Sequence, residues 1–208
     1  MLDFIFPDVP ACVYCGASLP MGDACESCEK TLQQNRLQEP IRFVDFLCHS
    51  AYGYHEQIST LIQGFKFDDR QYHSAYLARE MAMVLRERNV RFDFITAVPL
   101  HKKREKFRGY NQAALIADAL AEIYGSEKRN ILKRIKNTKP QSLLERSERQ
   151  ANVRDAFVLE KDADVFGKKI LLVDDVITVG ATMQNCVKVL LESGAKEVVA
   201  ATFAAAIH

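Results

Sequence analysis

The chain lacks a long apolar run, a basic leader, internal repeats and any sizeable net charge. No stretch approaches the roughly 18 consecutive apolar residues that cross a bilayer as a helix, so we expect no transmembrane segment. The start, Met1-Leu2-Asp3-Phe4, has neither a basic leader nor a long apolar core, so we expect no signal peptide. The sequence therefore predicts a cytoplasmic protein, in which cysteine thiols stay reduced.

The small net charge is unevenly distributed along the chain. Its total of +1 argues, taken alone, against a nucleic-acid partner. Residues 100–154, however, carry 14 Lys/Arg and 6 Asp/Glu, a net charge of +8, whereas the segments on either side are net acidic. This basic region indicates either an anionic partner or a solvated face, and charge alone does not choose between them.

Apolar runs and amphipathic stretches alternate along the chain. Strands are expected at residues 43–54, 92–99, 131–135, 169–173 and 197–203, with a short strand-like segment at 65–67. Helices are expected at residues 56–64, 72–88, 109–124 and 183–192, and a polar loop at 100–107. Residues 136–155 are polar and compatible with a helix. This alternation predicts an α/β fold with a parallel sheet flanked by helices, whose ligands bind at the carboxyl ends of the strands. We expect the sheet domain at residues 43–208, preceded by a small module and connector at residues 1–42.

One predicted strand runs directly into two carboxylates and a loop of small residues. Residues 170–173 are apolar, Asp174 and Asp175 follow, and an amphipathic helix is expected from Met183 onward. The loop contains Thr178, Val179, Gly180, Ala181 and Thr182. Free N–H groups at the start of a helix bind phosphate, and carboxylates suit sugar hydroxyls and a divalent cation. The pattern therefore predicts a sugar-phosphate site, against the alternative of a merely solvated Asp pair.

Four of the six cysteines form two Cys-x-x-Cys pairs near the start of the chain. The pairs are Cys12 with Cys15 and Cys25 with Cys28. This spacing is typical of a tetrahedral zinc site, and four thiolates leave no open position, so the zinc is expected to be structural. A disulfide pair is disfavoured by the compartment and a redox motif by the duplication. The other two cysteines, Cys48 and Cys186, have no spaced partner and are expected to be buried and unreactive.

The strand, acid pair, loop and helix together resemble the phosphoribosyl diphosphate (PRPP) motif of the type I phosphoribosyltransferases. The resemblance implies that Asp174 and Asp175 hold the ribose 2- and 3-hydroxyls, that residues 178–182 wrap the 5-phosphate, and that Mg²⁺ accompanies the diphosphate. It also implies that Lys66, Arg104 and Arg108 stabilise the departing diphosphate, with a solvated cationic loop as the alternative for the two arginines.

Further motifs are similar to the ComF family, phosphoribosyltransferase-fold proteins linked to DNA uptake in competent bacteria. They comprise Ile62, Phe65-Lys66-Phe67, Val98-Pro99-Leu100-His101, Arg104, Arg108-Gly109-Tyr110-Asn111-Gln112, Arg134, Thr138, Gln141, Leu144, Arg149, Asn152-Val153 and Ala156-Phe157. The four paired cysteines match the zinc module that many members carry. Val179 departs from the family pattern, which usually has Thr there, so the phosphate cradle loses one hydroxyl but keeps its backbone N–H groups.

The ComF resemblance implies a competence protein that binds PRPP with Mg²⁺ and assists the uptake of single-stranded DNA, at the inner face of the membrane. Two alternatives stay open. One is a working phosphoribosyltransferase, a glycosyltransferase whose acceptor is unidentified because no segment reveals an acceptor pocket. The other is a PRPP-sensing module whose zinc domain docks a partner such as a DNA-translocation helicase.

Overall fold

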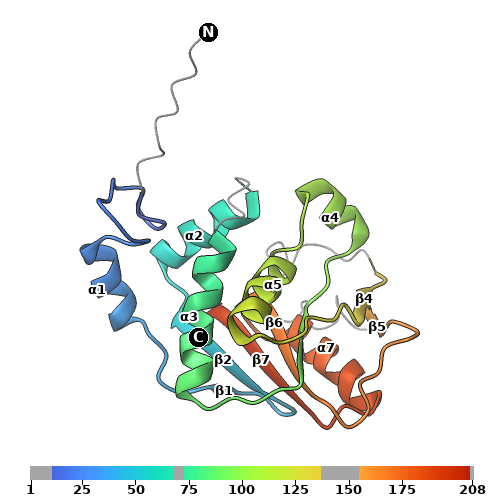
Figure 1. Cartoon of the computed structure of the whole chain (residues 1–208). Coiled ribbons are helices and arrows are strands. Elements are labelled where there is room, and N and C mark those ends of the chain that lie inside the picture. Colours follow the sequence, from blue (N-terminus) through green and yellow to red (C-terminus); the bar gives the residue numbers. More distant parts are fainter. Residues whose placement is uncertain (1–10, 68–72, 137–154, 207–208) are drawn as a thin grey trace.

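A mostly parallel sheet forms the centre of the protein, as the sequence predicts. The computed structural model describes residues 11–67, 73–136 and 155–206 (Figure 1). Within these residues five strands form a sheet in the order β1-β2-β7-β6-β3. The parallel strands are β2 (Leu47–Gly53), β7 (Glu197–Ala205), β6 (Lys169–Ile177) and β3 (Phe94–Ala97). The short edge strand β1 (Ile41–Arg42) runs antiparallel to β2.

Helices cover both faces of this sheet. The larger ones are α2 (Glu56–Phe67), α3 (His73–Glu87), α5 (Gln112–Tyr124) and α7 (Ala181–Glu192). α3 and α5 pack against each other and against the sheet, and α7 packs on β6 and β7. The chain moves toward β3 when it leaves β2 and back toward β7 when it leaves β6, so right-handed crossovers place α3 and α7 on opposite faces. Buried between them, residues 170–173 of β6 have no exposed surface.

Two segments expected to be strand and loop are helical. Residues 65–67 are the last turn of α2, and the expected loop at 100–107 is largely α4 (Lys102–Arg108). The α4 sequence is rich in good helix formers, and His101 caps it by accepting a hydrogen bond from the N–H of Lys103 at 3.2 Å. Gly109 ends the helix with φ +86°, a conformation that glycine adopts without strain. Both expectations were wrong. Phe65 continues the buried stripe of α2 formed by Ile58, Leu61 and Ile62, and the polar residues 102–108 are good helix formers between two caps.

A two-stranded antiparallel ribbon lies beside the main sheet. It consists of β4 (Leu132–Arg134) and β5 (Phe157–Leu159), and β5 packs against α7. The strand expected at 131–135 is therefore present but belongs to this ribbon, whereas β5 was not expected. The segment 136–155, which is compatible with a helix, lies outside the described residues except for its two ends.

The cysteine-containing segment packs against α3 rather than standing apart. It ends in α1 (Glu26–Gln34), and the hydroxyl of Tyr14 donates to that of Tyr76 on α3 at 2.9 Å. Asp23 forms an ion pair with Arg79 on the same helix. Buried residues of this segment, including Tyr14 and Cys28, belong to the same apolar cluster as those of the sheet. The segment and the sheet therefore share one continuous core.

Candidate functional site

The phosphate loop predicted from the sequence lies between β6 and α7. The two carboxylates are still part of β6, and α7 begins at Ala181 with Gly180 as its N-cap. A small hollow of about 50 Å³ lies here. It is lined by Asp174, Val176, Ile177, Thr178, Gly180, Ala181, Thr182 and Met183. The N-terminal turn of α7, with its backbone N–H groups and the positive end of its dipole, thus lines the same hollow as Asp174.

The acid pair is joined by a lysine from a different part of the chain. Nζ of Lys66, at the end of α2, lies 2.6 Å from Oδ2 of the buried Asp175. Burial raises the pKa of Asp174 well above the usual range of a carboxyl group, and the adjacent Asp175 charge raises it further, while Lys66 opposes both effects. Two carboxylates and a cation are therefore concentrated at the carboxyl end of β6.

Arginines approach the site from α4 and from β4. The partly buried Arg104 and Arg108 lie on α4, and Arg108 donates to Oε1 of Gln112 at 2.6 Å. Burial, and then the charge of Arg104, lower the pKa of the buried Arg134, whereas Asp174 opposes that shift. Arg134 thus lies within the electrostatic reach of both Asp174 and Arg104. The sequence linked Arg134 to a family motif but did not predict that it lies near the site.

Two motif residues fix α4 and α5 relative to the rest of the site. The buried hydroxyl of Tyr110 donates to the backbone carbonyl of Phe65 at 2.6 Å, next to Lys66. The side-chain amide of Asn111 donates to the carbonyl of Val98 at 3.0 Å and accepts a bond from the N–H of Ala113, which caps α5. The Gly-Tyr-Asn motif therefore has a structural role: it ties the arginine-bearing helix to the ends of α2 and β3.

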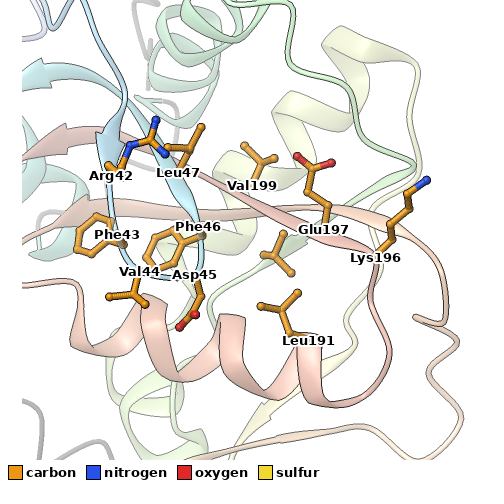
Figure 2. A pocket seen from close by; sticks show the side chains of 11 residues that line it. Arg42, Phe43, Val44, Asp45, Phe46, Leu47, Leu191, Lys196, Glu197 and Val199 are labelled. Carbon is orange, nitrogen blue, oxygen red and sulfur yellow. The ribbon is translucent and has the colours of Figure 1, made fainter.

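The phosphate loop also touches the β1–β2 turn, a contact that the sequence gave no reason to expect. A larger hollow of about 330 Å³ lies between this turn, the far end of α7 and the start of β7 (Figure 2). In Figure 2 Phe43 lies at one end of this hollow and Lys196 at the other. The rings of Phe43 and Phe46 are stacked with centroids 4.6 Å apart. A Cβ atom added to Gly180 would lie 2.4 Å from Cε1 of Phe43, so the Phe43 ring packs directly on the loop.

Gly180→Ala is expected to destabilise the protein by at least about 2 kcal/mol, because left-handed backbone costs Ala about 1–2 kcal/mol and overpacking adds about 1–3 kcal/mol. The φ of Gly180 is +76° and its added methyl would collide with the Phe43 ring. Chemical denaturation measures the change. Gly167→Ala is the matched control, since its φ is +68° but nothing lies within 4 Å of the added atom. Equal losses in the two variants would show that the Phe43 contact has no energetic weight.

The four paired cysteines come together, and the other two are buried. The sulfur atoms of Cys12, Cys15, Cys25 and Cys28 all lie within 4.8 Å of one another. Cys15 Sγ and Cys25 Sγ are 3.7 Å apart, close to the spacing of about 3.8 Å that follows from tetrahedral coordination with zinc–sulfur bonds of about 2.3 Å. Cys48 and Cys186 have no exposed surface, as expected, and burial raises the pKa of both thiols.

The Cys12 thiol is already biased toward the thiolate that a metal requires. Burial raises the pKa of Cys12, but three neighbouring backbone N–H groups, including that of Cys25, outweigh burial and lower the pKa to about 6. The N–H of Cys25 lies 3.4 Å from Cys12 Sγ. The cluster thus has the ligand type, number and spacing of a tetrahedral metal site.

Among the described helices, none is both long enough and apolar enough to cross a membrane.

Comparison with known proteins adds independent findings. A family model described as phosphoribosyl transferase domain matches residues 72–208. Competence protein F of Haemophilus influenzae is 31% identical over 196 residues, which cover 91% of this chain and 82% of that protein. DNA utilization protein YhgH of Salmonella typhi is 33% identical with the same coverage. Competence protein ComFC of Bacillus subtilis is 27% identical over 184 residues, 88% of this chain and 72% of that protein.

Two solved structures that align with part of this chain were compared as well. A glutamine PRPP amidotransferase from B. subtilis has a TM-score of 0.42 and 25% identity, covering 64% of this chain and 25% of that one. An adenine phosphoribosyltransferase from Thermoanaerobacter pseudethanolicus has a TM-score of 0.44 and 13% identity, covering 84% of this chain and 99% of that one.

Proposed function

This chain belongs to the ComF family of proteins with a phosphoribosyl transferase domain, and from that premise we propose that it binds PRPP together with Mg²⁺ and acts in DNA uptake. One observation carries the PRPP assignment. The acid pair, the start of α7 and the amine of Lys66 meet at the carboxyl end of β6. A sugar that carries a phosphate at one end and a diphosphate at the other requires this combination of acceptors, N–H donors and cations.

The ribose and the 5-phosphate use neighbouring parts of the site. Asp174 and Asp175 accept hydrogen bonds from the 2- and 3-hydroxyls. Residues 178–182 wrap the 5-phosphate with backbone N–H groups and with the hydroxyls of Thr178 and Thr182. Val179 is partly buried against the core, so its side chain adds packing where a Thr would add a hydroxyl. The backbone donors and the helix dipole therefore provide most of the phosphate affinity.

The diphosphate is neutralised by cations from two elements. Lys66 exchanges its ion pair with Asp175 for the incoming diphosphate, and Arg104 and Arg108 reach the diphosphate from α4. Mg²⁺ accompanies the diphosphate and supplies positive charge to its oxygens. These residues bind and stabilise the leaving group whether or not an acceptor completes a transfer reaction.

A structural zinc ion bound by the four clustered thiolates fits the cysteine segment. The sulfur spacing and the lowered pKa of Cys12 support this assignment. The ion stabilises a segment with little apolar core of its own and holds Tyr14 against Tyr76.

In the cell, we assign this protein to the cytoplasmic side of the inner membrane, where it assists the transfer of incoming single-stranded DNA. The names of its relatives, competence protein and DNA utilization protein, support the DNA role. The net charge of +8 over residues 100–154 supports direct contact with phosphate groups. A DNA-translocation helicase is a partner consistent with this position.

Calorimetric titration with PRPP tests the central assignment. We expect saturable binding that weakens at least tenfold when Mg²⁺ is removed with a chelator. Ribose 5-phosphate, which lacks the diphosphate, should bind more weakly than PRPP. Absence of PRPP binding in the presence of Mg²⁺ would refute the assignment. Release of diphosphate from PRPP only in the presence of one base or amine from a panel would instead identify a working transferase.

A further inference from the structure

We propose that the outer face of α4 binds single-stranded nucleic acid, with the ring of Phe107 stacked on an unpaired base and the neighbouring lysines on the phosphates. The proposal deepens the DNA role proposed above and rests on it for the identity of the partner. Its physical basis is the arrangement of side chains on α4 itself.

The two faces of α4 carry different kinds of residue. Arg104 and Arg108 are four residues apart, so they share one face, and both are partly buried. Lys103 and Phe107 are also four apart, and Lys106 lies three residues from Lys103, so these three residues share the outer face. All three are exposed, as is Lys102. The arginine face of the helix is thus partly covered by the rest of the protein, whereas the lysine face is open to solvent.

The Phe107 side chain is 90% exposed, which leaves its ring unused in the packing of the protein. A single exposed apolar residue is common on protein surfaces and has no meaning by itself. Here the ring lies among three exposed lysines within a seven-residue helix. An aromatic platform beside cations that follow a phosphate backbone is the arrangement with which proteins bind single strands without regard to sequence.

Chemistry favours a single strand over the other anionic partners. In a duplex, the faces of the bases are covered by their neighbours in the stack, so an exposed ring gains nothing from them. A membrane-surface helix needs an apolar face of several side chains, and Phe107 is the only apolar residue between Lys102 and Arg108. One ring suffices for one unpaired base.

The platform is held in place by contacts at both ends of α4. His101 caps its start, and Gly109 ends it. The next residue, Tyr110, is bonded to the carbonyl of Phe65 beside Lys66. Figure 1 shows α4 at the top of the fold, above α5. Nucleic acid on the outer face and PRPP on the inner face would therefore be held by one short, anchored helix.

The test is fluorescence anisotropy of a labelled 20-residue oligothymidylate. Phe107→Ala should weaken binding about tenfold or more, as expected for the loss of one stacked base, whereas Phe107→Tyr should retain it. The matched control is Phe166→Ala, which removes a ring that is 81% exposed elsewhere on the surface. An oligonucleotide of abasic residues should bind wild type and Phe107→Ala equally. Equal affinities of Phe107→Ala and Phe166→Ala for oligothymidylate would overturn the proposal, as would no binding by wild type.

The lysines are tested through salt dependence. Lys103→Ala with Lys106→Ala should reduce the slope of log affinity against log salt by about 1.4, since each phosphate contact on a single strand contributes about 0.7. An unchanged slope would contradict their role. If Phe107→Ala loses binding to anionic phosphatidylglycerol vesicles but keeps its oligonucleotide affinity, the face is a membrane contact and the proposal fails. Phe107→Ala should bind PRPP with wild-type affinity. Failure of the nucleic-acid proposal can therefore be distinguished from failure of the PRPP assignment.

Discussion

Replacing Asp174 and Asp175 together by Asn is expected to weaken PRPP binding at least about 100-fold, since hydrogen bonds to charged groups contribute about 1.5–3 kcal/mol each. The amide side chains keep the size of the carboxylates but lose the negative charge that attracts ribose hydroxyls and the cation. Lys66, released from its 2.6 Å pair with Asp175, keeps its attraction for the diphosphate, so residual binding should depend on the diphosphate. Calorimetric titration in excess Mg²⁺ measures the loss.

The same double variant should melt within a few degrees of wild type. Burial and the charge of Asp175 raise the pKa of Asp174 in the folded state above its unfolded value of about 4. A raised carboxyl pKa means that stability is fully present below the unfolded pKa and falls as pH rises through the folded pKa. At neutral pH the burial of Asp174 is therefore unfavourable to folding, because the carboxyl group must either take up a proton or be buried with its charge. Its replacement by Asn removes this cost and offsets the loss of the Lys66 ion pair.

A control that removes two carboxylate charges elsewhere shows whether the loss of PRPP affinity comes from the acid pair itself or from the change in net charge. Asp162 and Asp164 are both exposed and precede β6. Their joint replacement by Asn should leave PRPP affinity unchanged. If the Asp174 and Asp175 variant instead retains wild-type affinity, the acid pair does not hold the ribose.

Removal of zinc is expected to lower the melting temperature of the whole protein by about 10 °C, because a loss of about 3 kcal/mol corresponds to about 2–4 °C per kcal/mol in a chain of this size. The reason is the shared core: Tyr14 and Cys28 are buried in the same cluster as residues of α3 and the sheet. Loss of the metal would release Tyr14 from Tyr76 and expose apolar surface on α3.

Scanning calorimetry with and without a zinc chelator, together with a metal assay, measures this effect. A single shifted transition would mean that the predicted units 1–42 and 43–208 melt together, whereas two transitions would mean that they melt separately. Cys28→Ser should reproduce the shift, and the chelator should then have no further effect. Met21→Ala, at an exposed position between the two cysteine pairs, is the control. An unchanged melting temperature after chelation would contradict the structural role of zinc.

Local signals were enough to predict the phosphate loop. The apolar run, the acid pair and the small-residue loop are contiguous in sequence, so the order of strand, loop and helix could be inferred directly, and β6 and α7 confirm it. The cysteine cluster could be predicted equally well, because the spacing within each pair limits where its sulfurs can lie. Both features depend on residues close together in the chain.

Contacts between distant segments could not be inferred in this way. The pairing of Lys66 with Asp175 depends on where α2 ends relative to β6, and the sequence suggested a strand at that point. The position of Arg134 depends on the β4–β5 ribbon, whose second strand has only three residues. Such short strands carry too few residues for periodicity to identify them.

The contact between Phe43 and Gly180 has a consequence for how this fold can vary. A turn at the edge of a sheet ordinarily accepts inserted residues, because few other parts of the protein depend on its length. Here the aromatic ring at the start of the turn rests against Gly180, the N-cap residue of α7. An insertion in the turn would withdraw the ring and leave the start of α7 unsupported. The length of a hairpin at the edge of the sheet is therefore coupled to the start of α7, which follows a strand two positions away in the sheet.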